Sequence, residues 1–135
     1  MRQGFRVLVG GKGGDGMARI LITDDAALMR QMLGDILRRE GYEVDEAESG
    51  RDCVDKVAKE SYDLVTMDIT MPEMDGLQTL KVIKDLKPEQ RVIMVSAMGQ
   101  TPMVVDAIRY GACDFVVKPF DAKAILKIID NVLKR

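Results

Sequence analysis

Five positions carry side chains that could accept a phosphoryl group if they met in one place. They are an aspartate pair, a third aspartate, a serine and a lysine: Asp24, Asp25, Asp68, Ser96 and Lys118. Oxygen-only ligands favour Mg²⁺, with Mn²⁺ as the alternative, over zinc or copper. A carboxylate oxygen that is not used by the metal can act as a nucleophile, while an ammonium and a hydroxyl can stabilise the transferred group. The residue types therefore predict phosphoryl transfer to Asp68.

The elements expected around these positions alternate between strand and helix. Short buried strands are predicted over residues 20–22, 42–47, 63–67, 92–95 and 115–117. Amphipathic helices follow them, with apolar stripes at Leu28, Met29, Met32, Leu33, Ile36 and Leu37, then Val54, Val57 and Ala58, then Leu77, Leu80 and Ile83, and finally Ala124, Ile125, Ile128, Ile129 and Val132. This alternation favours a parallel sheet with helices on both faces. Ligands bind beyond the carboxyl ends of such strands, where the five positions fall.

The composition limits the classes of function. The chain has 135 residues, 47% of them hydrophobic and 31% charged, which is typical of one soluble globular domain. A net charge of −2 gives no reason to expect nucleic-acid or membrane binding. No apolar run approaches the roughly 20 residues that span a bilayer, and no secretion signal is evident, so we expect a cytoplasmic protein. Cys53 and Cys113 are expected to be free thiols. Histidine is absent, so any phosphohistidine donor must be another protein.

Residues 1–17 differ from the rest and hold six of the twelve glycines. We interpret them as a disordered or non-native extension, with a possible short strand over 5–9, and place the domain at residues 18–135. The stretch 10–16 could also be read as a deviant phosphate loop of a nucleotide-binding enzyme. Met17 and Ala18 stand where such a loop needs its lysine and its hydroxyl, which argues against that alternative.

Each candidate residue also has a structural explanation. Asp24 or Asp25 could cap the first helix, Asp68 could brace its loop, Ser96 could cap the next helix, and Lys118 could be solvated. Their coincidence at the ends of four strands favours a shared site. Two other functions share parts of this chemistry. A Mg²⁺-dependent phosphatase with an aspartate nucleophile needs an acid where Thr70 stands, and a flavodoxin-like electron carrier needs hydroxyls where the aspartate pair stands.

Residues 18–135 resemble the receiver domain of two-component response regulators. The motifs that carry the resemblance are residues 20–25, 65–72, 75–76, 95–97 and 117–120. The resemblance implies a flavodoxin-like (βα)5 α/β sandwich of three layers, with a five-stranded parallel sheet in the order 2-1-3-4-5. It also implies a regulator that takes its phosphoryl group from a sensor histidine kinase and is not a turnover enzyme on separate substrates. The lack of an output domain and the loop sequences are similar to the chemotaxis members of this family.

The resemblance assigns roles around the acidic cluster. It makes Asp68 the phosphoacceptor and Lys118 the contact to the phosphoryl group. It gives Mg²⁺ direct ligands from Asp25, Asp68 and the backbone carbonyl of Thr70, with Asp24 acting largely through water. It also implies a cis peptide bond between Lys118 and Pro119.

The resemblance further implies a switch and a target. Ser96 would be the switch hydroxyl and Phe115 the switch aromatic, and the last helices with the fifth strand would contact a flagellar switch protein or another target. Candidate contact residues are Met98, Met103, Val104, Ile108 and Tyr110. A phosphorelay intermediate or a phosphate sink is the alternative role. Because many relatives carry a polar group at the position of Met98, we also hypothesise that Met98 slows dephosphorylation.

Overall fold

A parallel five-stranded sheet forms the centre of the computed structural model, which describes residues 18–97 and 99–135. The strands are β1 (Arg19–Thr23), β2 (Glu43–Ala47), β3 (Leu64–Met67), β4 (Val92–Ser96) and β5 (Asp114–Val117). They lie in the order β2-β1-β3-β4-β5, which confirms the predicted topology. The chain order reverses at β1, which pairs with β2 on one side and with β3 on the other. The predictions for residues 1–17 and for Met98 lie outside the described residues.

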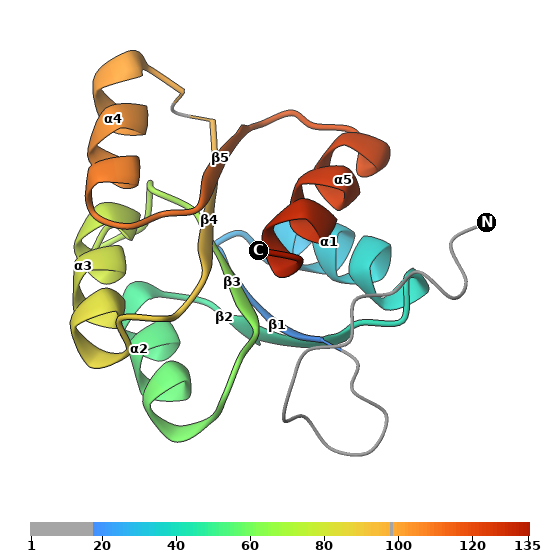
Figure 1. Ribbon diagram of the computed structural model, residues 1–135, viewed down its shortest axis with the longest axis horizontal. Coiled ribbons are helices and arrows are strands. Elements are labelled where there is room, and N and C mark those ends of the chain that lie inside the picture. The colour runs from blue at the N-terminus through green and yellow to red at the C-terminus, as the bar shows by residue number, and fades with distance from the viewer. Residues whose placement is uncertain (1–17, 98) are drawn as a thin grey trace.

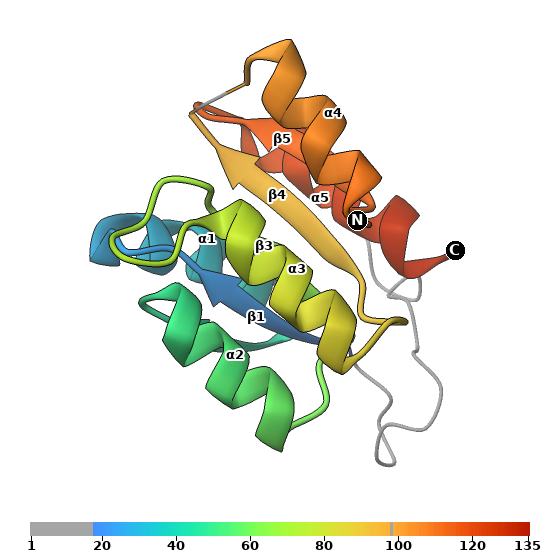
Figure 2. The same cartoon turned by 90° about the vertical axis from the view of Figure 1, so that its left-hand side faces the viewer.

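Five helices cover the two faces of the sheet (Figure 1). They are α1 (Ala27–Arg39), α2 (Gly50–Lys59), α3 (Gly76–Leu86), α4 (Thr101–Arg109) and α5 (Ala122–Leu133). Helices α1 and α5 cover one face, and Figure 2 shows α2, α3 and α4 side by side across the other. The three layers are those predicted. Among the helices in the described part of the chain, none is both long enough and apolar enough to cross a bilayer.

The N-terminal ends of the helices show whether Asp24, Asp25 or Ser96 caps a helix. The N-caps of helices α2, α3 and α5 are Ser49, Asp75 and Asp121, whose side chains accept backbone hydrogen bonds. Helix α1 instead has Ala26 at its N-cap with no side-chain cap. The predicted alternative of a cap by Asp24 or Asp25 is therefore wrong, because three residues separate β1 from α1 and the backbone N–H from which the Asp24 carboxylate accepts, at 2.9 Å, is that of Ala26, before the first turn. Helix α4 starts after Gln100, so Ser96 is not a cap either.

The hydrophobic core has one layer on each face of the sheet. Strands β3 and β4 are buried along their whole length, as expected for central parallel strands. One layer packs β1, β3 and β4 against Leu33 and Leu37 of α1 and Ile125 and Ile129 of α5. The other layer packs the sheet against α2, α3 and α4.

Four residues of the predicted stripes are exposed instead of buried. Leu28 is 80% exposed and Met32 is 45% exposed, and Ala58 and Ala124 are exposed as well. On α1 the buried residues follow the row that contains Leu33 and Leu37, four positions apart. Leu28 and Met32 lie one residue earlier, about 100° around the helix. The apolar pattern was therefore wider than the contact that the helix makes with the sheet.

Two further expectations match the structure. Cys53 is buried and Cys113 is partly buried, and both are free thiols. The peptide bond between Lys118 and Pro119 is cis.

Candidate metal and phosphoryl site

Backbone hydrogen bonds between neighbouring strands hold the predicted residues at one edge of the sheet. The N–H of Asp24 donates to the carbonyl of Ala47 at 3.1 Å, and the N–H of Asp68 donates to the carbonyl of Thr23 at 3.0 Å. In the same way the N–H of Lys118 donates to the carbonyl of Ser96 at 3.0 Å. Each bond continues the sheet ladder one step past a strand. The sheet itself therefore fixes the backbone positions of Asp24, Asp68 and Lys118.

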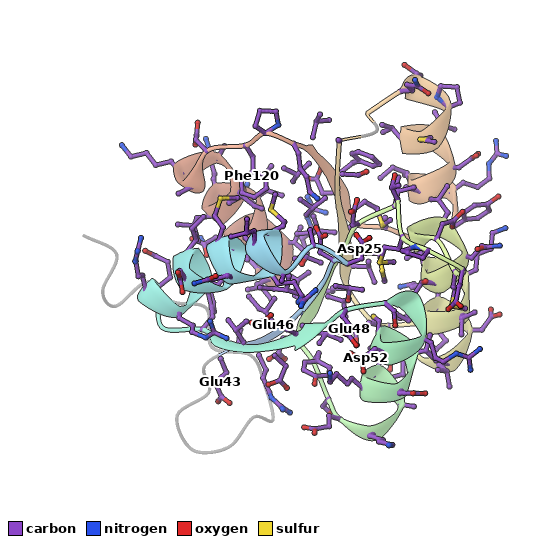
Figure 3. The ribbon with its side chains drawn as sticks, turned by 180° about the vertical axis from the view of Figure 1, so that it is seen from behind. Asp25, Glu43, Glu46, Glu48, Asp52 and Phe120 are labelled. Carbon is purple, nitrogen blue, oxygen red and sulfur yellow. The ribbon has the colours of Figure 1, made fainter. Side chains whose placement is uncertain are left out.

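Three carboxylates gather at this edge. One oxygen from each of Asp24, Asp25 and Asp68 lies within 4.8 Å of the others. Asp24 and Asp68 are 3% and 8% exposed, whereas Asp25 is open to solvent. Figure 3 shows Asp25 on the side of the molecule that also carries Glu48. A cluster of oxygen ligands with one open side fits a divalent cation that keeps several of its waters, as Mg²⁺ does.

Lys118 is the counter-charge inside this cluster. Its Nζ donates to Oδ2 of Asp24 at 2.7 Å and lies 3.5 Å from Oδ2 of Asp68, and its side chain is only 15% exposed. A solvated lysine, the structural alternative, is therefore wrong. A single ammonium cannot neutralise three carboxylates, so the cluster keeps an excess of negative charge that a bound cation would offset.

The electrostatics of Asp68 follow from its position. Burial raises the pKa of the Asp68 carboxyl above its ordinary value, and the neighbouring Asp24 carboxylate raises it further. The ammonium of Lys118 and a hydrogen bond from the Ser96 hydroxyl act in the opposite direction, but burial dominates and the net pKa shift is upward. In the absence of a cation, the charged form of Asp68 is thus less favoured than that of an ordinary exposed aspartate.

The two predicted switch residues lie at different depths. Ser96 is fully buried, and its hydroxyl donates to the Asp68 carboxylate. Phe115 is partly buried and packs against the core layer that contains Met94. The structure therefore brings Ser96 into the site and leaves Phe115 two positions along β5 from the residue paired with Ser96. Thr70 is exposed in the loop after β3.

Close backbone contact holds the loop that follows Asp68. The N–H of Gly76 donates to the carbonyl of Ile69 at 2.8 Å. A Cβ atom on Gly76 would lie 2.1 Å from the Asp68 carbonyl oxygen, so only glycine lets α3 start this close to β3. Within the same loop Glu73 has a φ of 66°, and it is the only non-glycine residue with a positive φ in the described ranges.

Sequence reasoning missed one residue that contacts this site. Arg30, in the first turn of α1, donates from Nη1 to the backbone carbonyl of Asp24 at 2.7 Å. Its Nε donates to Oε1 of Glu46 at 3.0 Å. Nothing in the spacing of the sequence marks Arg30 as different from other arginines on a polar helix face.

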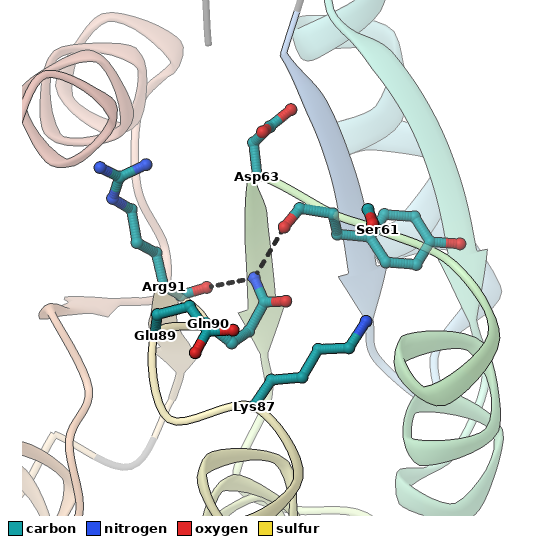
Figure 4. Close-up of a pocket in the computed structure, with 7 residues that line it drawn as sticks. Ser61, Asp63, Lys87, Glu89, Gln90 and Arg91 are labelled. Carbon is teal, nitrogen blue, oxygen red and sulfur yellow. Dashed lines mark hydrogen bonds between the residues drawn. The ribbon is translucent and has the colours of Figure 1, made fainter. Parts of the chain in front are cut away.

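A polar pocket of about 290 Å³ lies at the opposite edge of the sheet, where β3 and β4 begin (Figure 4). Ser61, Tyr62, Asp63, Lys87, Glu89, Gln90 and Arg91 line it. Its buried amide is satisfied locally, since Nε2 of Gln90 donates to the carbonyls of Tyr62 at 3.0 Å and Arg91 at 3.2 Å. This pocket is separate from the carboxylate cluster.

The fold and the acidic edge define a receiver domain. The sequence matches the response regulator receiver domain family over residues 20–130, and the chain belongs to that family. Within it, the chain is similar to the chemotaxis protein CheY of Bacillus subtilis, with 58% identity over 116 residues that cover 85% of this chain and 97% of that protein. CheY of Thermotoga maritima is 50% identical over 117 residues, covering 86% and 98%.

Solved structures give the same result. A CheX–CheY–BeF3–Mg²⁺ complex from Borrelia burgdorferi has a chain that matches with a TM-score of 0.85 and 37% identity, covering 87% of this chain and 91% of that chain. CheY4 of Vibrio cholerae matches with a TM-score of 0.82 and 30% identity, covering 86% and 98%. The chain is a CheY-like response regulator receiver. Membership of this family argues against the two alternatives considered from the sequence, the phosphatase and the electron carrier.

Proposed function

We propose that this receiver accepts a phosphoryl group on Asp68 from a histidine kinase and acts in chemotaxis signalling in the cytoplasm. One observation carries the proposal: a buried carboxylate, Asp68, lies beside Lys118 in a cluster of three carboxylates at the edge of the sheet. The names of the similar CheY proteins support the chemotaxis role. A phosphorelay intermediate or a phosphate sink would use the same chemistry on Asp68.

The donor set supports a Mg²⁺ site, with Mn²⁺ as a substitute. Asp24, Asp25, Asp68 and the backbone carbonyl of Thr70 would hold the ion, Asp24 largely through water. When bound, the ion supplies positive charge that neutralises the phosphoryl oxygens during transfer. The remaining steps depend on side chains of this chain.

In the proposed transfer, an Oδ atom of Asp68 attacks the phosphorus of an external phosphohistidine. The new O–P bond forms as the P–N bond of the donor breaks, and its electron pair returns to the imidazole nitrogen. Lys118 Nζ, at 3.5 Å from Asp68 Oδ2, is within reach of an oxygen of a group attached there. Positioning and charge neutralisation provide most of the rate, because little other covalent chemistry is required. The protein modifies itself and turns over no separate substrate.

The signal would leave through Ser96 and Phe115. A phosphoryl group on Asp68 offers new acceptor oxygens, and the Ser96 hydroxyl could leave the carboxylate to bond one of them. Movement of Ser96 would free space beside β5 for the Phe115 ring, which is a packing change of the kind that switches use.

The proposed target surface is formed by α4, β5 and α5. Val105, Ile108 and Val117 are 47%, 48% and 48% exposed there, so this surface offers apolar side chains to a partner. Of the candidate contact residues that the structure describes, Met103, Val104 and Tyr110 are partly buried, so among these Ile108 is the one best placed to meet a partner. A flagellar switch protein is the proposed target. The Borrelia burgdorferi CheY was solved in complex with CheX, so a CheY-like receiver does bind another protein.

The test is phosphoryl uptake from a small donor. The purified chain is incubated with acetyl phosphate and MgCl₂, and its intact mass is measured against an Asp68→Asn control. We expect a gain of roughly 80 daltons in the wild type only. No gain in the wild type, or an equal gain in Asp68→Asn, would refute the assignment of Asp68.

A further inference from the structure

The loop that carries the aspartate pair is held from outside the carboxylate cluster. Asp24 and Asp25 share one peptide group, and its carbonyl oxygen accepts the hydrogen bond from Nη1 of Arg30 at 2.7 Å. The backbone N–H of Arg30 donates to the carbonyl of Ala26 at 3.1 Å, so the same residue also closes the first turn of α1. Rotation of the Asp24–Asp25 peptide would move both carboxylates, and Arg30 opposes that rotation.

Arg30 is itself held in place. Its side chain is 14% exposed, and its Nε donates to Oε1 of Glu46 on β2 at 3.0 Å. The backbone carbonyl of Glu46 accepts from Nζ of Lys56 at 2.7 Å, which ties this part of β2 to α2. A partly buried guanidinium with a carboxylate on one side and a carbonyl on the other has little freedom. The contact therefore links three elements to the peptide between the two aspartates.

We propose that Arg30 is a positioning residue for the divalent cation site, acting through the Asp24 carbonyl and oriented by Glu46. The inference rests on the proposed function, because it assumes that the carboxylate cluster binds Mg²⁺. Metal ligands must be held within about 0.5 Å of their productive geometry. Groups outside the ligand shell that orient ligands commonly change metal affinity by about 10-fold to 100-fold when they are replaced.

Electrostatics alone would give the opposite effect. Arg30 is a cation beside an acidic cluster, so it repels an incoming Mg²⁺. A variant that lacks the charge should therefore bind Mg²⁺ more tightly if Arg30 contributes only its charge. It should bind more weakly if Arg30 positions the ligands and that contribution is the larger one. The sign of the change in affinity separates the two roles.

Arg38 provides a matched control. It lies on the same helix, and its Nη2 is 3.6 Å from Oε2 of the same Glu46. Its side chain is 48% exposed, and none of its hydrogen bonds in the described part of the chain reaches the aspartate loop. Arg38→Met thus removes the same charge and a contact to the same partner without touching the Asp24 carbonyl.

The experiment is calorimetric titration of MgCl₂ into the wild type, Arg30→Met, Arg30→Lys, Glu46→Gln and Arg38→Met, well below the unfolding temperature of each. We expect Arg30→Met to raise the dissociation constant for Mg²⁺ by about 10-fold. Arg30→Lys keeps the charge but loses the fork that joins Asp24 to Glu46, so it should weaken binding at least as much. Glu46→Gln should weaken it less, and Arg38→Met should leave it within about twofold.

Each of the other possible results contradicts either the positioning role of Arg30 or the cation site itself. Unchanged or tighter Mg²⁺ binding by Arg30→Met overturns the positioning role. An equal loss in Arg38→Met also overturns it, because the effect would then come from general surface charge. If Arg30→Met does not fold, wild-type affinity in Arg30→Lys overturns the role on its own. Failure of the wild type to bind Mg²⁺ refutes the proposed cation site, a result distinct from any of these.

Discussion

The two edges of the sheet both bury polar groups, but they satisfy them differently. At the amino edge, where the strands begin, Asp63 accepts from the backbone N–H of Arg19 at 2.7 Å, and Gln90 donates to two carbonyls. At the carboxyl edge, where the strands end, Asp24 and Asp68 both contact the ammonium of Lys118, and the Asp25 carboxylate lies close by. The amino edge needs nothing further, whereas the carboxyl edge keeps an excess of negative charge.

This difference separates structural polar residues from functional ones. Buried polar groups stabilise a fold when every donor and acceptor has a partner. Buried carboxylates that repel one another destabilise it, and they are retained where a ligand completes them. Burial and residue type alone would have marked Asp63 and Asp68 as equally good site candidates. The partners of each carboxylate distinguish them.

The largest effect is expected for Lys118→Met, which removes the counter-charge at the carboxyl edge. The rate of phosphoryl uptake from acetyl phosphate should fall by about 100-fold or more, because one preorganised positive group at the transferring oxygens is lost. Intact mass measured over time gives the rate. Lys87→Met removes a lysine at the amino edge, where Nζ donates to the Glu60 carbonyl, and should leave the rate unchanged. Similar losses in both variants would remove the distinction between the edges.

Gln90→Leu should damage the amino edge and spare the site. The substitution leaves the Tyr62 and Arg91 carbonyls without their amide donor in a buried position. We expect the free energy of unfolding to drop by about 2 kcal/mol. Urea denaturation measures this loss, and phosphoryl uptake should keep its wild-type rate. A variant with normal stability would show that the amino-edge contacts contribute little.

Asp68→Asn should change stability in the opposite direction to Gln90→Leu. It should raise the free energy of unfolding of the metal-free protein by about 1 kcal/mol, because it removes a charge from a crowded, buried cluster. The pKa of Asp68 is raised in the folded state, so its proton stabilises the fold below the unfolded value of about 3.9. That stabilisation is lost as the pH rises through the higher folded pKa.

The advantage of Asp68→Asn over the wild type should therefore be absent at low pH and grow toward neutral pH. Urea denaturation in EDTA at several pH values measures it, and added MgCl₂ should reduce the difference by stabilising the wild type. An advantage that is equally large at low pH would contradict this explanation.

The smallest effect is expected at Glu73, whose φ of 66° suits glycine better. Glu73→Gly should stabilise the protein by about 0.5 kcal/mol, the relief of the left-handed conformation less the extra freedom of glycine in the unfolded chain. Thermal unfolding at fixed pH gives the shift. A loss of stability would show that the Glu73 side chain contributes contacts that outweigh its backbone strain.

The elements and most of the site could be predicted because both follow from simple geometry. Parallel strands end at the same edge, so polar residues that follow Ile22, Met67 and Val95 had to meet. The strand order came from the resemblance to receiver domains and not from the pattern itself. Helix faces were predicted less well, since Leu28 shares the apolar character of the buried row without lying on it.

Arg30 could not have been found from the pattern. Its function depends on a side chain that reaches back to a carbonyl six positions earlier and across to another strand. Hydrophobic periodicity says nothing about such a contact. The capping alternative for Asp24 failed for a related reason, because the helix start depends on the loop conformation and not on residue type alone.

The most direct test of the central claim uses beryllofluoride, a tetrahedral analogue of the phosphoryl group, observed by ¹⁹F NMR. We expect bound fluorine resonances in the wild type and in Gln90→Leu only when beryllium, fluoride and Mg²⁺ are all present. We expect none in Asp68→Asn. Bound resonances in Asp68→Asn, or in the wild type without any divalent cation, would contradict a site built from Asp68 and a divalent cation.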